Sequence, residues 1–364
     1  MTAPLLQLVH MSDLHFRQRH GPSSVTARVR GRMAPARMSV FQGMEGHDPQ
    51  VLGPLVQSIR RRVGPSKDAF RHGTYLVVTG DLATLGDAAS AERAERLVRD
   101  IAAQAGLPAP FVVYGNHDVW PGSLPLFAQD ADCDAQRAAL RARPLHAADR
   151  PARALDAGPF SLWYLDSVRH GRFENTLALG RIDADRYWEK ERKLRPQLEL
   201  LAEAATRSEL RIALTHHPVL QASKWRPWKG LRNWAEIEQG LAAPDPAGGR
   251  HRLVRVVISG HTHAIYPALG RLASDIATRN ARQVHAQLVI GTATQLRHGA
   301  PPDRVEADLE QHHCWQLLRF YEEPDGRLLL ERVVFVRSGS VVPDYAPVSF
   351  SGNPRNVAER AYLL

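Results

Sequence analysis

The chain has 364 residues, of which 44% are hydrophobic and 23% are charged, so it can bury a full core without a disulfide or a structural metal. This composition excludes a disordered, collagen-like or coiled-coil protein, and two cysteines are too few for a disulfide framework or a four-thiolate zinc site. The net charge of +9 is compatible with a nucleic-acid partner, an anionic substrate or only a soluble surface.

The positive charge is concentrated in two segments. Six arginines and no acidic residue lie between Arg17 and Arg37, and four basic residues lie between Lys224 and Arg232. Without these ten, 37 basic residues face 38 acidic ones. A local site for an anion is therefore favoured over a diffuse nucleic-acid surface.

The start of the chain and its hydropathy bear on location. No stretch approaches the roughly 20 apolar residues of a membrane helix, and Met1-Thr2-Ala3-Pro4 leads directly into a short apolar run. The low cysteine content suits a reducing compartment. We therefore expect a cytoplasmic protein with no membrane partner.

Short apolar runs bounded by Gly, Pro, Asp and Asn predict strands. These runs lie at 5–10, 75–79, 111–114, 160–165, 211–215, 253–259 and 287–290. Most are continuous rather than alternating, which is typical of strands buried on both faces. Helical patterns lie between them, at 50–63, 88–105, 183–205 and 233–241.

Two further β-rich runs, at 314–321 and 327–336, flank the turn sequence Glu-Glu-Pro-Asp-Gly and predict a closing hairpin. We expect a layered α/β sandwich that forms a single domain over residues 1–337. The domain carries a basic insertion at about 17–49 and a loop rich in tryptophan and basic residues at 224–234. Residues 338–364 form a C-terminal extension.

Side chains suited to metal binding follow five of the first six predicted strands. The segments are Ser12-Asp13-Leu14-His15, Thr79-Gly80-Asp81, Gly115-Asn116-His117-Asp118, Thr215-His216-His217-Pro218 and Gly260-His261-Thr262-His263. Open α/β sheets bind ligands at the carboxyl ends of their strands, and hard or borderline metals bind carboxylate, amide oxygen and imidazole. Gly80, Gly115 and Gly260 each precede a candidate ligand, where the backbone must turn and approach a bound group closely. Each motif is weak alone, but the set predicts a metal site.

This ordered set of motifs resembles the calcineurin-like metallophosphoesterase superfamily, over roughly residues 5–336. The resemblance implies a four-layer α/β/β/α sandwich of two mixed sheets, with two divalent metal ions (manganese, iron or zinc) at the loop edge. It implies that Asp13, His15 and His263 hold one metal, that Asn116, His216 and His261 hold the other, and that Asp81 bridges them. His117, paired with Asp118, would be the catalytic residue and not a ligand.

The implied reaction is hydrolysis of a phosphoester by in-line attack of a metal-bridging hydroxide. A carboxylate at Asp81 supplies negative charge between two cations, and the neutral Asn116 keeps the second metal more electrophilic. Held by Asp118, His117 can remain largely imidazolium and donate a proton to the leaving oxygen. His217 either supports the site or is structural. The remaining histidines of interest, His10, His298, His312 and His313, are interpreted as structural or surface residues.

Within the superfamily, four segments are most similar to bacterial class III cyclic-nucleotide phosphodiesterases. They are the run Val77 to Leu82, the segment Leu165-Asp166-Ser167 that ends the fourth predicted strand, the His216-His217-Pro218 block and the segment Gly291-Thr292-Ala293-Thr294. This similarity predicts a phosphodiester substrate, such as a cyclic nucleotide or another small nucleotide-like diester. The insertion at 17–49 departs from the compact pattern of that type and leaves the substrate open.

Candidate substrate-binding residues combine the centre with the basic loop. They are Asn116, His117, Lys224, Trp225, Arg226 and Trp228. Cations beside aromatic rings suit a phosphate next to a flat base, although such a loop can also only pack against the sandwich while its charges stay in water. The insertion at 17–49 is open to the same two interpretations, a lid or a solvated loop.

Several alternatives remain at this level. The same site would serve a phosphomonoesterase or a nuclease, and the fold could be a non-catalytic scaffold. The scaffold is disfavoured because all seven ligand positions and the His117-Asp118 pair are present. A nucleic-acid partner is not favoured, because it rests only on charge and tryptophans, and a homo-oligomer is left open.

Overall fold

A computed structural model describes just over half of the chain. The described residues are 3–16, 49–84, 86, 88–120, 135, 140, 152–154, 160–168, 180–182, 197–198, 201, 210–219, 230–244, 253–262, 286–290, 293, 313–338, 344–349 and 357–363.

The larger of two sheets has seven strands in the order β11-β10-β9-β1-β2-β3, and β12 also pairs with β10. Its strands are β1 (Ala3–Met11), β2 (Thr74–Thr79), β3 (Phe111–Val113), β9 (Cys314–Glu322), β10 (Leu328–Ser338), β11 (Asp344–Pro347) and β12 (Ala358–Leu363). β1 lies parallel to β2 and antiparallel to β9, so the sheet is mixed.

The smaller sheet has five strands in the order β4-β5-β6-β7-β8. Its strands are β4 (Ala152–Ala154), β5 (Phe160–Tyr164), β6 (Leu210–Leu214), β7 (Val256–Ser259) and β8 (Ala286–Val289). β5 to β8 run parallel and β4 is antiparallel to β5, so this sheet is mixed as well.

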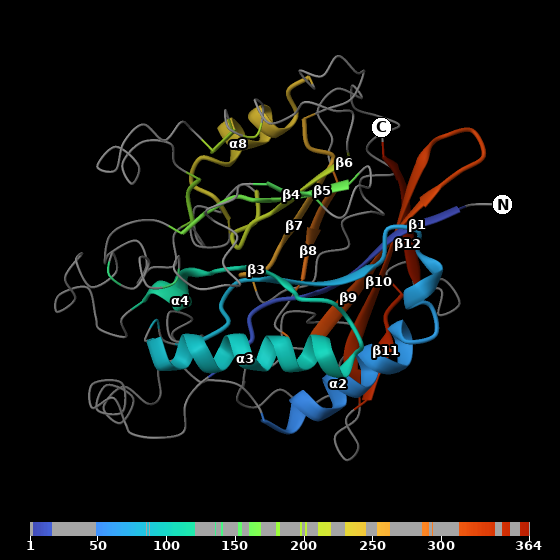
Figure 1. Ribbon diagram of the computed structural model, residues 1–364. Helices are drawn as coiled ribbons and strands as arrows, with labels where there is room; N and C mark the ends of the chain where they lie inside the picture. Colours follow the sequence, from blue (N-terminus) through green and yellow to red (C-terminus); the bar gives the residue numbers. More distant parts are fainter. Residues whose placement is uncertain are drawn as a thin grey trace.

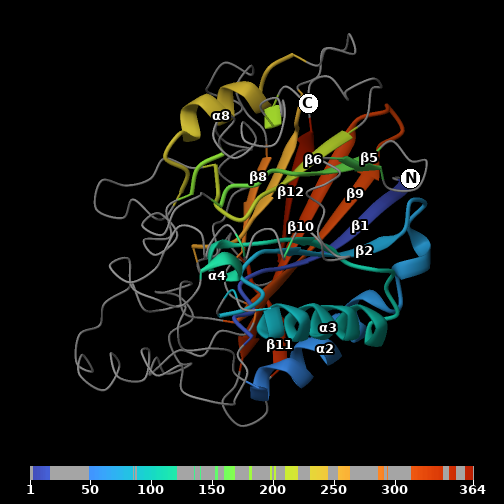
Figure 2. The same ribbon diagram turned by 60° about the vertical axis from the view of Figure 1, so that its left-hand side comes forward.

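Helices cover the outer face of each sheet (Figures 1 and 2). On the larger sheet these are α2 (Pro49–Val63) and α3 (Ala88–Gln104), and on the smaller sheet α8 (Trp234–Leu241). Two short elements are the 3₁₀ helix η2 (Lys67–Ala69) and α4 (Asn116–Val119), which directly follows β3. Among the described helices, none has the length and apolar character needed to cross a membrane.

Three apolar clusters hold the layers together. Val9 of β1 packs with Val98 and Ile101 of α3. Its neighbour Leu8, on the other face of β1, belongs to the cluster between the sheets. α8 packs in a third cluster against the smaller sheet. β1 is thus buried on both faces, which explains its continuous apolar sequence. The layer order confirms the predicted α/β/β/α sandwich.

Most predicted elements are present within one to three residues of their predicted bounds. The closing hairpin is confirmed, and the Gly326 amide donates to the Glu323 carbonyl (2.9 Å) at a φ of 80° that favours glycine. The predicted helix at 183–205 lies almost wholly outside the described residues. β4, β11 and β12 were not expected, because they are short and lack a continuous apolar run. β11 and β12 come from the predicted C-terminal extension, and both pair with β10.

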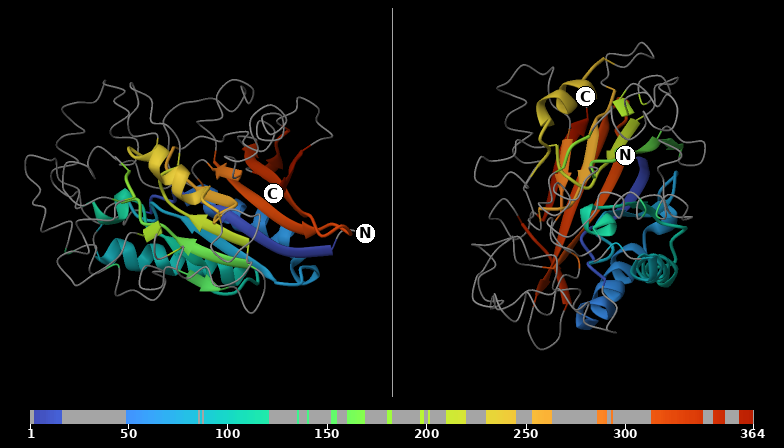
Figure 3. Two further views of the ribbon diagram at one scale, coloured as in Figure 1. Left: turned by 90° about the horizontal axis from the view of Figure 1, so that it is seen from above. Right: turned by 90° about the vertical axis from the view of Figure 1, so that its left-hand side faces the viewer.

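The parallel strands of both sheets place their carboxyl ends at one end of the sandwich, beside α4 and opposite the start of β1 (Figure 3). The two loops after β1 and β2 are joined there by backbone hydrogen bonds. The His15 amide donates to the Asp81 carbonyl (2.9 Å), and the Phe16 amide donates to the Leu82 carbonyl (2.8 Å). Side chains from both sheets therefore meet at this end.

Candidate metal centre

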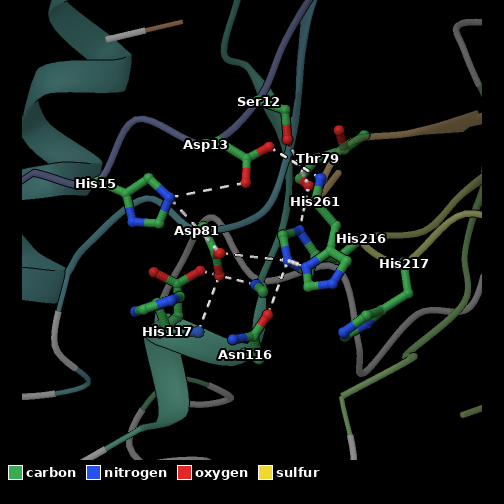
Figure 4. A network of polar contacts seen from close by, with 12 residues as sticks. Ser12, Asp13, His15, Thr79, Asp81, Asn116, His117, His216, His217 and His261 are labelled. Atoms are coloured by element: carbon green, nitrogen blue, oxygen red, sulfur yellow. Dashed lines mark hydrogen bonds and ion pairs between the residues drawn. The ribbon is translucent and has the colours of Figure 1, made fainter. Parts of the chain in front are cut away.

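The predicted site residues that the structure describes lie together at this end of the sandwich (Figure 4). They follow β1, β2, β3, β6 and β7, and they are Asp13, His15, Asp81, Asn116, His117, His216 and His261. Asp118 directly follows His117, and its carboxylate accepts the Gly115 amide. The others lie outside the described residues, namely His263, Lys224, Trp225, Arg226 and Trp228, as does the insertion up to residue 48.

Backbone amides orient the two carboxylates that face the cluster. The His261 amide donates to Asp13 Oδ2 (2.9 Å), and the His117 amide donates to Asp81 Oδ1 (2.9 Å). The other oxygens point at imidazoles, with Asp13 Oδ1 3.8 Å and Asp81 Oδ2 3.8 Å from His15 Nε2. Each carboxylate thus has one oxygen held by the backbone and one turned into the cluster.

His216 occupies the middle of the cluster. Its Nδ1 donates to the Thr79 carbonyl (2.8 Å), and because a carbonyl can only accept, the Nδ1 atom carries a proton. Its Nε2 lies 3.1 Å from Asn116 Oδ1, 3.1 Å from His261 Nδ1 and 3.4 Å from Asp81 Oδ2. An amide oxygen, an imidazole nitrogen and a carboxylate oxygen thus converge on His216 Nε2.

Such a convergence favours a positive charge. Burial opposes charge on both partners, but the attraction between Asp81 and His216 outweighs it, so the pKa of His216 is raised to about 9 and the pKa of Asp81 lies well below its usual range. A proton on His216 Nε2 and a metal cation would satisfy the same acceptors. The donor set of carboxylate, amide oxygen and imidazole therefore fits divalent cations.

Three overlapping groups of side chains place ligand atoms within 4.8 Å of one another. The groups are Asp13, Asp81 and His216, then His15, Asp81 and His117, and then His216, His217 and His261. Asp81 and His216 each belong to two groups, which places them between the outer ones. His117 and His217 also come within reach of a cation, although the sequence analysis did not assign them as ligands.

His117 and Asp118 do not pair in the predicted way. The Asp118 carboxylate accepts the backbone amides of Leu82 (3.2 Å), Ala83 (2.8 Å) and Gly115 (2.8 Å), and the His117 ring instead places Nδ1 3.1 Å from the Thr84 carbonyl. Burial lowers the pKa of His117, although the Asp81 carboxylate opposes the shift. The prediction that Asp118 holds His117 is therefore wrong. Asp118 instead joins the loops after β2 and β3.

His217 lies beside the cluster and is held from the smaller sheet. The Ser167 hydroxyl is 2.9 Å from His217 Nδ1 and accepts the His217 amide (3.1 Å). The His217 ring centroid lies 4.1 Å from that of His261. Its contact with a candidate ligand favours the supporting role over a remote structural one.

The backbone at the centre is strained. Among the described residues, the non-glycine residues with positive φ are Asp13 (55°), His15 (48°), Asp81 (48°) and His261 (69°), all of them predicted ligands. Such conformations cost roughly 1–3 kcal/mol each and persist where the surroundings enforce them, which is typical of functional sites.

The three glycines singled out in the sequence lie in tight contacts. A Cβ atom on Gly80 would lie 2.2 Å from His216 Nδ1, one on Gly115 would lie 2.2 Å from Asp81 Oδ1, and one on Gly260 would lie 1.8 Å from Ser12 Oγ. These distances leave no room for a side chain. The glycines let backbone and ligands approach closely.

Sequence reasoning missed the residues that orient the imidazoles. Thr84 and Thr79 act through backbone carbonyls, which no side-chain pattern reveals. Ser167 was part of the Leu165-Asp166-Ser167 segment noted in the sequence, directly after β5, but its contact with His217 was not predicted.

The described residues on either side of 220–229 lie close together. The Leu231 amide donates to the Pro218 carbonyl (3.2 Å), and the Arg232 amide donates to the Gly180 carbonyl (2.9 Å). Leu231 is therefore held beside the segment that contains His216 and His217.

Comparisons with known proteins identify a family model that matches most of the chain. The family model described as calcineurin-like phosphoesterase matches residues 6–264. Nineteen chains of solved structures match, and one of them is the Termus thermophilus sulfate thiohydrolase SoxB in complex with glycerol, at 14% identity and a TM-score of 0.37. The alignment covers 94% of this chain, which spans about half (56%) of that one. No curated protein matches.

Proposed function

The chain belongs to the calcineurin-like phosphoesterase family, and we propose on that premise that it uses two divalent metal ions to hydrolyse a small phosphodiester. The observation that carries the proposal is the position of one buried oxygen, Asp81 Oδ2. It lies 3.8 Å from His15 Nε2 and 3.4 Å from His216 Nε2, between the two sides of the cluster. A carboxylate in that position can neutralise the repulsion between two cations.

In this proposal Asp81 is shared and each metal has three further ligands. Asp13, His15 and His263 would hold one ion, and Asn116, His216 and His261 would hold the other. Manganese, iron and zinc all suit this ligand chemistry. When bound, the ions stabilise charge on phosphoryl oxygens and lower the pKa of a water molecule.

The chain's own residues orient the reactants and move protons. The His216 ring presents Nε2 because Thr79 holds Nδ1, and the amides of His117 and His261 keep the carboxylates in place. His117, with Nδ1 on the Thr84 carbonyl, has Nε2 left to take up a proton and deliver it to the leaving oxygen.

Two features support a diester that carries a flat group. The motif context resembles cyclic-nucleotide phosphodiesterases. In addition, Leu231, which follows Lys224, Trp225, Arg226 and Trp228 in the sequence, is hydrogen-bonded to Pro218, two residues after His216. Arginine and lysine next to indole rings suit a phosphate attached to an aromatic base.

The test is hydrolysis of bis(p-nitrophenyl) phosphate and of p-nitrophenyl phosphate, after chelation and re-addition of manganese, iron, zinc or magnesium. We expect metal-dependent cleavage of the diester that is faster than cleavage of the monoester. A faster monoester would replace the proposal with a phosphomonoesterase. Protein that binds no metal and cleaves neither ester would point to a non-catalytic scaffold.

A further inference from the structure

A row of polar side chains crosses the larger sheet on the face that packs against the smaller one. Its members lie on the neighbouring strands β2, β1, β9, β10 and β12, and they are Thr79, His10, Gln316, Arg332 and Glu359. His10 lies opposite Gln316, and Arg332 lies opposite Glu359. The first four are fully buried and the Glu359 side chain is nearly so. The row runs from the metal centre to the C-terminal strand.

The hydrogen bonds of this row have one direction. Arginine has only donors, so Arg332 Nε donates to Gln316 Oε1 (2.6 Å) and Gln316 Nε2 donates to His10 Nδ1 (2.6 Å). His10 must then carry its proton on Nε2, which donates to the Thr79 hydroxyl (2.8 Å). Burial and then the charge of Arg332 lower the pKa of His10 to about 3, so His10 is neutral at physiological pH.

The row ends at the residue that orients the central imidazole. The Thr79 carbonyl accepts His216 Nδ1 (2.8 Å) and the Ser12 hydroxyl (2.9 Å). The next residue is Gly80, with a φ of 98° and no side chain to anchor it. The hydrogen bond of the Thr79 side chain to His10 therefore helps to fix the position of the Thr79 carbonyl, which holds His216.

Arg332 connects this row to three strands at once. Besides Gln316 on β9, its guanidinium donates to Glu359 Oε2 on β12 (3.0 Å) and to the Val289 carbonyl on β8 of the other sheet (2.9 Å). Apolar residues often replace a buried ion pair without loss of stability, so stability alone does not require a charge here.

We propose that Arg332 is a positioning residue for the metal centre, acting through Gln316, His10 and Thr79 on the ring of His216. The C-terminal strand β12 takes part in the site through Glu359, although it contributes no ligand. The role of His216 as a ligand rests on the proposed function, whereas the orientation of its ring does not.

The decisive variant is Gln316→Glu, which has nearly the same shape. Its carboxylate still accepts from Arg332 but has no donor for His10 Nδ1. The His10 proton therefore moves to Nδ1, and the two hydrogen bonds of His10, to residue 316 and to Thr79, reverse their direction. We expect ¹⁵N spectra of the metal-free protein to show a changed His10 tautomer and shifted His216 ring signals. We also expect roughly 10- to 100-fold weaker Mn²⁺ binding by calorimetry, as found when groups that orient ligands are removed.

A matched pair of variants separates positioning from general loss of charge pairing. Arg332→Lys keeps the charge, but an ammonium cannot reproduce the planar fork of a guanidinium that contacts three acceptors. Arg319 forms a similar pair with Glu331 (3.1 Å) that is partly exposed. Arg332→Lys should shift the His216 signals and lower both Mn²⁺ affinity and kcat, with KM nearly unchanged. Arg319→Lys should leave all four at wild-type values.

The proposal is overturned if Gln316→Glu and Arg332→Lys alter the His10 signals and leave the His216 signals and Mn²⁺ affinity unchanged. The row would then be structural only. If the His216 signals move as expected while the wild-type protein cleaves neither ester, the positioning role stands and the proposed function fails. Thermal unfolding of each variant measures its folded fraction. Spectra and Mn²⁺ affinities are then compared at equal folded fraction, so that global destabilisation does not account for the differences.

Discussion

The two sheets contribute different chemistry to one centre. Among the described residues, the larger sheet supplies the predicted oxygen ligands Asp13, Asp81 and Asn116 and also the imidazole of His15. The smaller sheet supplies the imidazoles of His216 and His261. Backbone groups of each sheet orient side chains of the other. The His261 amide from the smaller sheet fixes Asp13, and the Thr79 carbonyl from the larger sheet fixes His216. Neither sheet carries an oriented site alone, so the centre depends on how the two sheets dock.

The largest expected effect comes from removing the charge of Asp81, which lies between His15 of the larger sheet and His216 of the smaller sheet. Asp81→Asn keeps the shape but leaves two cations without a bridging negative charge. We expect kcat to fall by roughly 10³-fold, or about 4 kcal/mol of activation free energy, and bound metal to fall below two ions per chain by elemental analysis. The control is Asp344→Asn at the exposed ion pair with Arg61, which should retain wild-type activity. Comparable losses in both variants would refute the assignment of Asp81.

The contact between the halves can be disturbed at Gly260. A Cβ there would lie 1.8 Å from Ser12 Oγ and 2.7 Å from Asp13 Oδ2, both on the larger sheet. Gly260→Ala should therefore lower the free energy of unfolding by roughly 1–3 kcal/mol and weaken metal binding as well. Gly53→Ala in α2 has nothing within 4 Å, so it should be neutral or stabilising. Chemical denaturation of both variants measures the difference.

The pKa of His10 on the larger sheet is lowered, whereas the pKa of His216 on the smaller sheet is raised. The two groups therefore change the stability of the protein in opposite directions as the pH falls. On the larger sheet, burial lowers the pKa of His10 from 6.5 to about 3, so the unfolded chain binds a proton between these values and the folded protein does not. Stability from this group is thus lost as pH falls below 6.5, by about 2 kcal/mol at pH 5. His10→Gln should remove this component from denaturation curves measured between pH 7 and pH 5. An unchanged pH dependence would contradict the neutral state of His10.

The smallest effect is expected from a change beside His217 on the smaller sheet. Ser167→Ala removes the hydroxyl beside His217 Nδ1 and leaves the carboxylates untouched. We expect a loss of stability of about 1 kcal/mol and a fall in kcat of no more than roughly 10-fold, seen in steady-state kinetics. Ser66→Ala, next to the remote 3₁₀ helix, is the matched control. A loss as large as that of Asp81→Asn would mean that His217 is itself a ligand.

The sequence predicted the side chains of the centre better than the groups that hold them. The buried runs of β1 and β2, each followed by an acidic residue, were enough to place Asp13 and Asp81 at one edge. The partner of His117 could not be predicted, because a backbone carbonyl has no signature and the acidic neighbour Asp118 was the obvious alternative. The hydrogen bonds of His10 could not be predicted for a similar reason. Its neighbours Gln316 and Arg332 are over 300 residues away and meet it only through strand register.

The position of β1 in the sheet has a consequence for folding during synthesis. β1 lies between β2 and β9, and Ala3 pairs with Glu322. A nascent chain leaves the ribosome from its N-terminus, so β1 waits with one edge unpaired until nearly the whole chain has emerged. Unpaired apolar strand edges favour aggregation. We therefore expect this chain to depend on chaperones late in translation, at the stage when β9 and β10 close the sheet.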